Sequence, residues 1–430
     1  MRNIKRTLTT TSGLTMLALT MLLAGTNATA QQERILHSFS NNSQGEFPIT
    51  GLIVDAAGNL YGTTSSGGAY GQGTVFELSP KAGGGWTQKI LHNFGNGNDG
   101  QSPWGGRLLM DASGNLYGTT RYGGTGMCVP LNPVSCGTVF ELMPNGSGGW
   151  REKVLYSFNS DNTVTGTDGY HPAGGVVMDA SGNLYGTTFY GGIHETTANG
   201  GTVFKLTPSA SGAWTEEILH NFGNGSDGNF LQCTLTIDAA GKLYGTTVSG
   251  GTSGGGTVFE MTSAAGAWTE DILFTFDAGD NDPASGLSPL AGVAIDASGN
   301  LYGTTGYGGS HYMGNVFELT PSPGGVWTET VIHTFGIGDG NTPQASLILD
   351  ASGNVYGTTF MGGKSNAGVV FKLSPAGGNW TEKFLHSFQI NGVDGTNPGS
   401  SLIMDAHRNL YGTTLYGGAG NGGTVFQIKP

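Results

Sequence analysis

The feature that most constrains this chain is a seven-residue motif, Gly-Asn-Leu-Tyr-Gly-Thr-Thr, which recurs seven times with small changes. Each copy follows an aliphatic run that ends in an aspartate. Those aspartates are Asp55, Asp111, Asp179, Asp238, Asp296, Asp350 and Asp405. They lie 54 to 68 residues apart, and self-similarity at a near-constant period is the signature of a repeat architecture.

Each repeat contains four strand-like segments, which in the first repeat are 51–54, 59–64, 74–78 and 86–94. The first is apolar at nearly every position, as in a strand covered on both faces. The third and fourth alternate apolar and polar residues, as half-covered strands do. Glycine makes up 79 of the 430 residues, which indicates many tight turns between short strands. Four antiparallel strands in somewhat more than fifty residues is typical of a β-propeller blade.

The two ends of the chain predict that the ring of blades closes. Residues 34–39 resemble a fourth segment with no third segment before it, and residues 423–428 resemble a third segment with no fourth after it. If the first strand completes the last blade, no sheet edge stays unpaired. We therefore predict an all-β fold, a seven-bladed β-propeller of four-stranded antiparallel blades over residues 31–430.

The N-terminus predicts a secretory signal peptide over residues 1–30. Arg2, Lys5 and Arg6 precede a short apolar run at 14–24, and Ala28-Thr29-Ala30 fits a cleavage site. The run is too short to span a bilayer with ease, and no cysteine follows it as in a lipoprotein. We expect a secreted protein, extracellular or periplasmic; the alternative is a retained signal anchor.

The charge balance limits the partners. The formal net charge is −13, and removal of residues 1–30 leaves 14 Lys and Arg against 30 Asp and Glu, a net charge of −16. A strongly acidic chain is a poor partner for nucleic acid or an anionic membrane surface. No later segment has a transmembrane pattern, and we expect a monomer.

Taken together, the repeated Asp-Ala-x-Gly-Asn-Leu-Tyr-Gly-Thr-Thr, Gly-Thr-Val-Phe-Glu-Leu and Trp-Thr-Glu-x-Ile-Leu-His-x-Phe segments are similar to the GloVer tandem repeat of bacterial exported proteins, the choice-of-anchor group. The resemblance covers residues 33–430. It implies export and a repeat array, and it supplies no catalytic residues. Unlike anchored members of that group, this chain is expected to have no C-terminal anchor, since no anchor pattern precedes Pro430.

Loop lengths select one rim of the propeller as the working face. We name the four strands of a blade a, b, c and d in chain order. The a–b and c–d turns keep nearly constant lengths, whereas the b–c step varies from 11 residues (Thr64 to Val75) to 19 (Thr120 to Val139). The d–a loops vary as well. Variable loops on a constant scaffold commonly bind ligands, so we expect the rim of b–c and d–a loops to do so.

Tyrosines recur on this rim after the Gly-Thr-Thr motif, at Tyr122, Tyr190, Tyr307 and Tyr416. Such rings could stack on sugars or clamp a peptide. The alternative is that each tyrosine packs on the Gly-Gly of its own loop.

Residues that break the repeat point to a pocket on the second and third blades. Arg107 replaces a small residue of strand a, Arg121 precedes Tyr122, and the third blade contributes His171, His194 and Glu195. An arginine with histidine and glutamate could bind a carboxylate or a uronic acid. If the protein is an enzyme, His171, His194 and Glu195 are the candidate catalytic residues. The alternative is ordinary polar decoration of long loops.

The cysteines and the acidic loops do not predict a catalytic or metal-binding site. Cys128 and Cys136 bracket one insertion and are expected to form a disulfide, whereas Cys233 is expected to be a buried free thiol. The Asp-Gly pairs of the d–a loops, such as Asp99-Gly100, leave a weak possibility of Ca²⁺, but no copy has the ligand spacing of a calcium loop, so turn formation is the preferred interpretation. The d-strand histidines (His37, His92, His220, His333 and His386) alternate with Tyr156 and Phe274 and are interpreted as packing residues, not as metal ligands. No metal site and no cofactor are expected.

These patterns favour an exported, non-catalytic β-propeller that binds a polysaccharide or a cell-surface partner through the b–c/d–a rim. One alternative is a propeller lyase acting on a polysaccharide or a cyclic ester. Another is a structural surface or adhesion module.

Overall fold

The computed structural model describes residues 33–40, 42–126, 135–159, 168–194, 200–278 and 285–430. The first blade contains β2 (Ile53–Val54), β3 (Leu60–Thr64), β4 (Thr74–Pro80) and β5 (Trp86–Asn93), hydrogen-bonded in that order and antiparallel throughout. These are the four segments expected of each repeat. Among the described residues no helix is long and apolar enough to cross a membrane.

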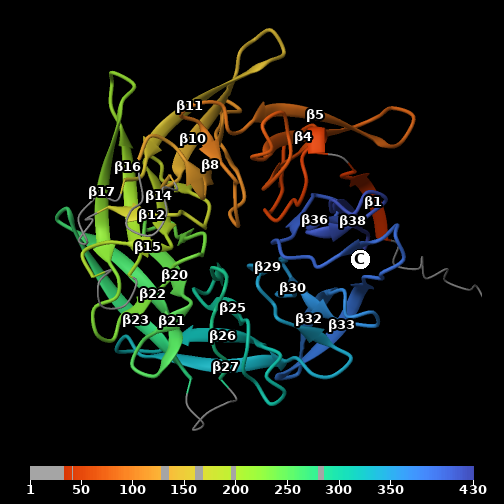
Figure 1. Ribbon diagram of the computed structural model, residues 1–430. Helices are drawn as coiled ribbons and strands as arrows, with labels where there is room; N and C mark the ends of the chain where they lie inside the picture. The colour runs from red at the N-terminus through yellow and green to blue at the C-terminus, as the bar shows by residue number, and fades with distance from the viewer. Residues whose placement is uncertain (1–32, 41, 127–134, 160–167, 195–199, 279–284) are drawn as a thin grey trace, which may run out of the picture. The chain divides into compact units, whose positions relative to one another are not determined.

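Six further blades repeat this order (Figure 1). Their strands are β7 (Leu109–Met110), β8 (Leu116–Thr120), β10 (Thr138–Pro144) and β11 (Trp150–Ser157); β13 (Val177–Met178), β14 (Leu184–Thr188), β16 (Thr202–Pro208) and β17 (Trp214–Asn221); β19 (Thr236–Ile237), β20 (Leu243–Thr247), β22 (Gly254–Ala264) and β23 (Ala267–Asp277); β24 (Ala294–Ile295), β25 (Leu301–Thr305), β26 (Asn315–Pro321) and β27 (Trp327–Thr334); β29 (Ile348–Leu349), β30 (Val355–Thr359), β32 (Val369–Ala376) and β33 (Asn379–Ser387); and β35 (Ile403–Met404), β36 (Leu410–Thr414), β38 (Thr424–Ile428) and β1 (Glu33–Ser38).

The N-terminal strand closes the ring, as the sequence predicts. Strand β1 pairs antiparallel with β38, with Glu33 opposite Ile428 and Ser38 opposite Thr424. Figure 1 shows the red β1 beside the blue β38, so the first strand supplies the fourth strand of the last blade. The propeller prediction, seven four-stranded blades closed by this strand, is therefore confirmed.

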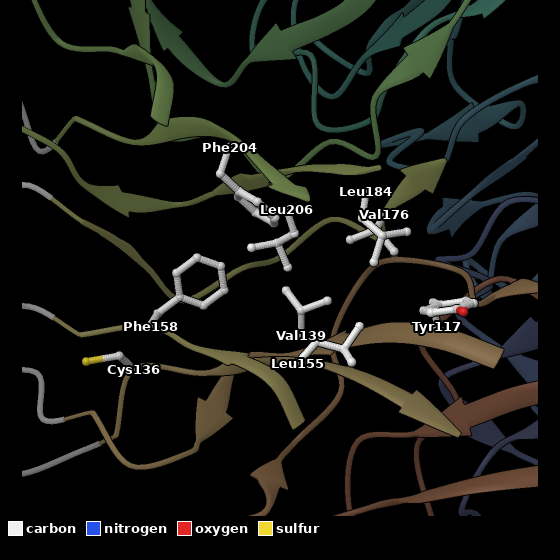
Figure 2. Close-up of a cluster of buried hydrophobic side chains, with 9 residues drawn as sticks. All are labelled: Tyr117, Cys136, Val139, Leu155, Phe158, Val176, Leu184, Phe204 and Leu206. Atoms are coloured by element: carbon white, nitrogen blue, oxygen red, sulfur yellow. The ribbon is translucent and has the colours of Figure 1, made fainter. Parts of the chain in front are cut away.

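Phenylalanine pairs join neighbouring blades around the ring. The d-strand phenylalanine of one blade packs against the c-strand phenylalanine of the next, as Phe158 does on Phe204 with ring centroids 5.1 Å apart (Figure 2). Equivalent pairs have centroids 4.9 to 5.3 Å apart: Phe39–Phe76, Phe94–Phe140, Phe222–Phe259, Phe276–Phe317, Phe335–Phe371 and Phe388–Phe426. Phe39, which follows β1, belongs to this set, so the closing seam is packed like the others.

The repeated motif follows from this packing. Gly62 is the second glycine of the first motif. A Cβ at this position would lie 2.7 Å from the ring of Phe76, so only glycine fits beneath that ring. Asp55 accepts hydrogen bonds from the backbone amides of Ala57 and Asn59, from the Asn59 side chain and from the Tyr61 hydroxyl. The repeated aspartate thus builds the a–b turn, as expected from the sequence.

The cysteine predictions have different outcomes. Cys233 is a free thiol with 1% exposure, and the backbone amide of Thr246 donates to its Sγ at 3.3 Å. The buried free thiol is therefore confirmed. Cys128 of the predicted disulfide lies outside the described residues, as does the predicted signal peptide at 1–30, so both stay predictions.

Candidate functional site

The b–c and d–a loops are joined on one rim. In each blade a short antiparallel pair links the loop before strand a to the loop after strand b. The pairs are β6 (Gly100–Gln101) with β9 (Tyr122–Gly123), β12 (Gly169–Tyr170) with β15 (Tyr190–Gly191), β18 (Gly228–Asn229) with β21 (Ser249–Gly250), β28 (Gly340–Asn341) with β31 (Met361–Gly362), β34 (Gly395–Thr396) with β37 (Tyr416–Gly417), and the single bridges Glu46–Ser66 and Leu287–Tyr307. The variable loops therefore share a common ordered base.

A non-glycine residue with positive φ follows each of these pairs. The seven residues have φ between 50° and 62°: Phe47, Ser102, His171, Phe230, Ser288, Thr342 and Asn397. His171 shows what fixes them, because its amide donates to the carbonyl of Cys136 at 2.8 Å and its carbonyl accepts from the amide of Phe189 at 3.2 Å. A left-handed conformation is costly for side chains of this size, and such positions cluster at functional sites. These seven residues therefore mark the part of the rim where a functional site is expected.

Aromatic side chains gather around one member of that ring, His171. Its ring centroid lies 4.9 Å from that of Tyr122, 5.0 Å from Tyr170 and 6.0 Å from Tyr190. Tyr190 in turn contacts Phe230, at 5.6 Å. The second, third and fourth blades thus contribute to one continuous cluster.

Arg121 connects this cluster to Trp104. Its guanidinium carbon lies 5.6 Å from the ring centroid of Tyr122 and 5.3 Å from that of Trp104. These are distances of cation–π contact. We call Trp104, Arg121, Tyr122, His171 and Tyr190 the rim cluster. Four of its members, Arg121, Tyr122, His171 and Tyr190, are site residues predicted from the sequence. Trp104 is not.

His171 is held neutral in this environment. Burial, with the positive charge of Arg121 as a smaller cause, lowers the pKa of His171 from 6.5 to about 4. Both ring nitrogens are buried, and no described residue forms a hydrogen bond with either of them. At neutral pH the imidazole is therefore an uncharged ring that packs between tyrosines.

A cavity of about 560 Å³ adjoins the rim cluster through Trp104 and is lined by residues of all seven blades, which places it on the central axis. Its polar lining includes Arg107, Gln232, Thr234, Gln344, Ser346 and Ser401. Among the described residues that line the cavity, Arg107 is the only one with an ionisable side chain. A cation with no carboxylate beside it in a narrow channel attracts an anion, because the low-dielectric walls focus its field.

Arg107 reaches solvent within the channel, yet protein surrounds it. Burial lowers the pKa of the guanidinium below its ordinary value, although arginine stays charged at neutral pH. A Cβ on Gly51 of the first blade would lie 3.2 Å from the Cβ of Arg107. Small residues such as Gly51 at the equivalent positions leave the space that the arginine occupies.

The remaining candidate residues lie apart from the rim cluster. Tyr416 is 41% exposed with its ring centroid 5.5 Å from that of Phe47, and Tyr307 is 47% exposed. The four tyrosines therefore form no single ring. His194 lies next to Gly223 of the following loop, and Glu195 lies outside the described residues.

Trp104 is the site residue that sequence reasoning missed. Six of the seven tryptophans occupy the start of a d strand, and Trp104 is the exception. The segment from Pro103 to Asp111 is also one residue longer than its counterpart from Pro48 to Asp55. Both irregularities are visible in the sequence and could have identified it.

The repeats match one known family along almost the whole chain. The profile of the Gloeobacter/Verrucomicrobia repeat matches residues 24–163, 133–355 and 328–430. The chain belongs to this repeat family. The resemblance drawn from the repeated segments is thereby confirmed. No functionally curated protein matches the sequence of this member of the repeat family.

Solved structures resemble this repeat-family member at low sequence identity. A candidate 6-phosphogluconolactonase from Bacteroides uniformis is 13% identical with a TM-score of 0.53, and the match covers 82% of this chain and 88% of that one. A protein of unknown function from Dyadobacter fermentans is 13% identical with a TM-score of 0.45, covering 82% and 96% of the two chains. At 13% identity, the likeness to the first of these structures supports the fold alone.

Proposed function

We propose that this protein is an exported, non-catalytic binding protein whose ligand is a polysaccharide that carries carboxylate groups, such as a uronic acid polymer. The ligand enters the mouth of the central channel from the b–c/d–a rim. Arg107 binds the carboxylate, and Trp104 with the tyrosines of the rim cluster stacks on the sugar rings. The observation that supports the proposal most is Arg107, the one ionisable side chain among the described residues that line the channel, together with Trp104 of the rim cluster in the same lining.

The chemistry of these residues suits such a ligand. Guanidinium groups bind carboxylates through two parallel hydrogen bonds, and aromatic faces suit the apolar face of a sugar. Gln232 and Gln344 line the same cavity and can exchange hydrogen bonds with hydroxyl groups. The cavity of about 560 Å³ has the size of a small-molecule site and accommodates the end of a chain or a short side branch.

The lyase alternative has less support. A general base must reach the proton that it removes, within about 3 Å. The ring nitrogens of His171 are buried beneath neighbouring side chains, so a substrate would not reach them without a rearrangement of the rim cluster. No specific observation favours the structural-module alternative over the other two.

The test is a calorimetric titration with short oligomers of galacturonic acid and, for comparison, of galactose. We expect the acidic oligomer to bind and the neutral one to bind far more weakly. Arg107→Ala removes a charge-assisted bond worth about 1.5–3 kcal/mol, so the affinity should fall about 10- to 150-fold. Trp104→Ala should also weaken binding.

Arg151→Ala is the matched control, because Arg151 is exposed on β11 and its loss changes the net charge equally. This variant should bind as tightly as the wild type. Equal binding of acidic oligomers by Arg107→Ala and wild type would contradict the channel site. Equal binding of neutral and acidic oligomers would contradict the proposed ligand class.

A further inference from the structure

The outer seams between blades hold side chains that the proposed binding function does not use. At two seams a histidine of one d strand, an aspartate of the following loop and a glutamate of the next blade's d strand converge. The two groups are His333, Asp339, Glu382 and His386, Asp394, Glu33. In each group one ligand atom from every residue lies within 4.8 Å of the others.

The first seam joins the fifth and sixth blades. His333 Nε2 lies 3.2 Å from Asp339 Oδ2 and 3.4 Å from Glu382 Oε1. Asp339 is oriented by the amide of Gly340, which donates to its other oxygen at 2.9 Å. Apart from this ion-pair contact with His333, Glu382 Oε1 is buried and has no hydrogen-bond partner among the described residues. An imidazole and two carboxylates therefore face one point from three separate chain segments.

The second seam joins the sixth blade to the N-terminal strand. His386 Nε2 lies 3.1 Å from Asp394 Oδ2, and Asp394 is only 7% exposed. Asp394 Oδ1 and Glu33 Oε1 are both buried, and neither has a hydrogen-bond partner in the described ranges of the chain. An unpaired buried carboxylate oxygen is costly, and two of them beside one imidazole leave a site that a cation would satisfy.

The corresponding positions at the other seams hold related side chains in other arrangements. Where Tyr156 replaces the histidine, its hydroxyl donates to Asp168 at 3.0 Å. Where Gln88 replaces the glutamate, its amide donates to the carbonyl of Gln44 at 3.0 Å. His92 and His220 keep a loop aspartate at 2.8 and 3.1 Å. Glu152 and Glu270 occupy the glutamate position at those two seams. In the part of the chain that the structure describes, the groups whose three ligand atoms lie within 4.8 Å of one another are the two that flank the sixth blade.

We propose that these two seams bind zinc ions, one held by His333, Asp339 and Glu382 and the other by His386, Asp394 and Glu33. One imidazole nitrogen with two carboxylate oxygens is a donor set that Zn²⁺ accepts, leaving a fourth position for water. The second ion connects β1 to the sixth blade, so it fastens the strand that closes the ring. Zinc then serves as a structural clamp, separate from the channel.

The test uses the purified protein after dialysis against a chelator. Titration with zinc chloride, followed by metal analysis of the desalted protein, should give two zinc ions per chain and a higher melting temperature. Asp339→Asn and Asp394→Asn should each bind one ion fewer, and the double variant should bind neither. Asp168→Asn is the matched control, because it changes the same loop position at a seam with tyrosine, and it should keep both ions.

A second pair of variants replaces the histidines, with substitutions chosen so that the protein should still fold. His333→Phe and His386→Phe place at these sites the residue that the chain already uses at Phe274, so they should fold and each lose one ion. Circular dichroism checks the fold of every variant. Absence of tight zinc binding by the wild type, or an unchanged stoichiometry in folded variants, would overturn the proposal. Loss of zinc should leave oligosaccharide binding at Arg107 unaltered, which separates this test from that of the channel.

Discussion

At the scale of single residues, one aspartate accounts for each repeat's a–b turn. Asp350 accepts hydrogen bonds from the amides of Ser352 and Asn354 at 2.8 and 3.0 Å, from the Asn354 side chain at 2.8 Å and from the Tyr356 hydroxyl at 3.0 Å. Partial burial alone would raise the pKa of Asp350, but these bonds outweigh it and lower the pKa. The carboxylate form therefore stabilises the turn.

Asp350→Ala should lower the free energy of unfolding by about 1–3 kcal/mol, because it leaves several donors without an acceptor. Because the folded-state pKa lies below the unfolded value, the contribution of Asp350 is present above pH 3.8 and is lost as the pH falls through the folded pKa. Urea unfolding of wild type and variant at pH 7 and pH 3 measures both effects. An equal difference in stability at the two pH values would contradict the role of the carboxylate.

At the scale of elements, the d strands of neighbouring blades bring buried glutamates together with loop aspartates. Glu216 on β17 is an example at a seam outside the proposed zinc sites. Burial raises its pKa to about 8, and the negative charges of Asp168 and Glu217 add to the effect. The folded protein therefore holds a proton on Glu216 at neutral pH.

Glu216→Gln should remove a pH dependence of stability. Because the folded-state pKa is raised, the wild-type contribution is full below pH 4.5 and is lost as the pH rises toward about 8. The variant and wild type should melt alike near pH 5, and the variant should melt about 1–3 °C higher at pH 9. Scanning calorimetry in chelator-containing buffer measures this. Gln88 already occupies the equivalent position at another seam, so the Glu216→Gln variant should fold. Melting temperatures of variant and wild type that change with pH in parallel would contradict the proposed role of Glu216.

At the scale of the whole molecule, stability depends on closing the ring. Strand β1 is separated from its partner β38 by nearly the whole chain, yet their register is continuous apart from one bulge. Phe39 and Phe388 are both fully buried and each packs on the c-strand phenylalanine of the next blade. Packing at the closing seam therefore equals packing at an interior seam.

Phe39→Ala and Phe388→Ala should lower the free energy of unfolding by similar amounts, about 3–5 kcal/mol each, from lost burial and the cavity left behind. Phe388 is the interior control for Phe39. Denaturant unfolding with one cooperative transition in both variants is the expected result. A Phe39 variant as stable as the wild type would show that the N-terminal strand contributes little to the closed ring.

The site was predictable in part. Arg107, Arg121 and His171 were selected because they interrupt a regular repeat, and the structure brings Arg121 and His171 into the rim cluster and Arg107 into the adjoining channel. Tyr307 lies elsewhere on the rim, because seven blades spread equivalent positions around a circle. Trp104 stands out in the sequence because it is the one tryptophan that does not begin a d strand. Its part in the site depends on its contact with Arg121, which the sequence does not show.

The sequence by itself determined the number of blades, the order of strands within each and the closure by the first strand. These features depend on local periodicity and on short turns, and both are written in consecutive residues. Tertiary structure alone decided which loops of different blades meet. Glu33 lies beside His386 and Asp394, more than 350 residues away, because the angle and number of the blades fix that distance once the ring has closed. No local pattern in the sequence encodes that separation.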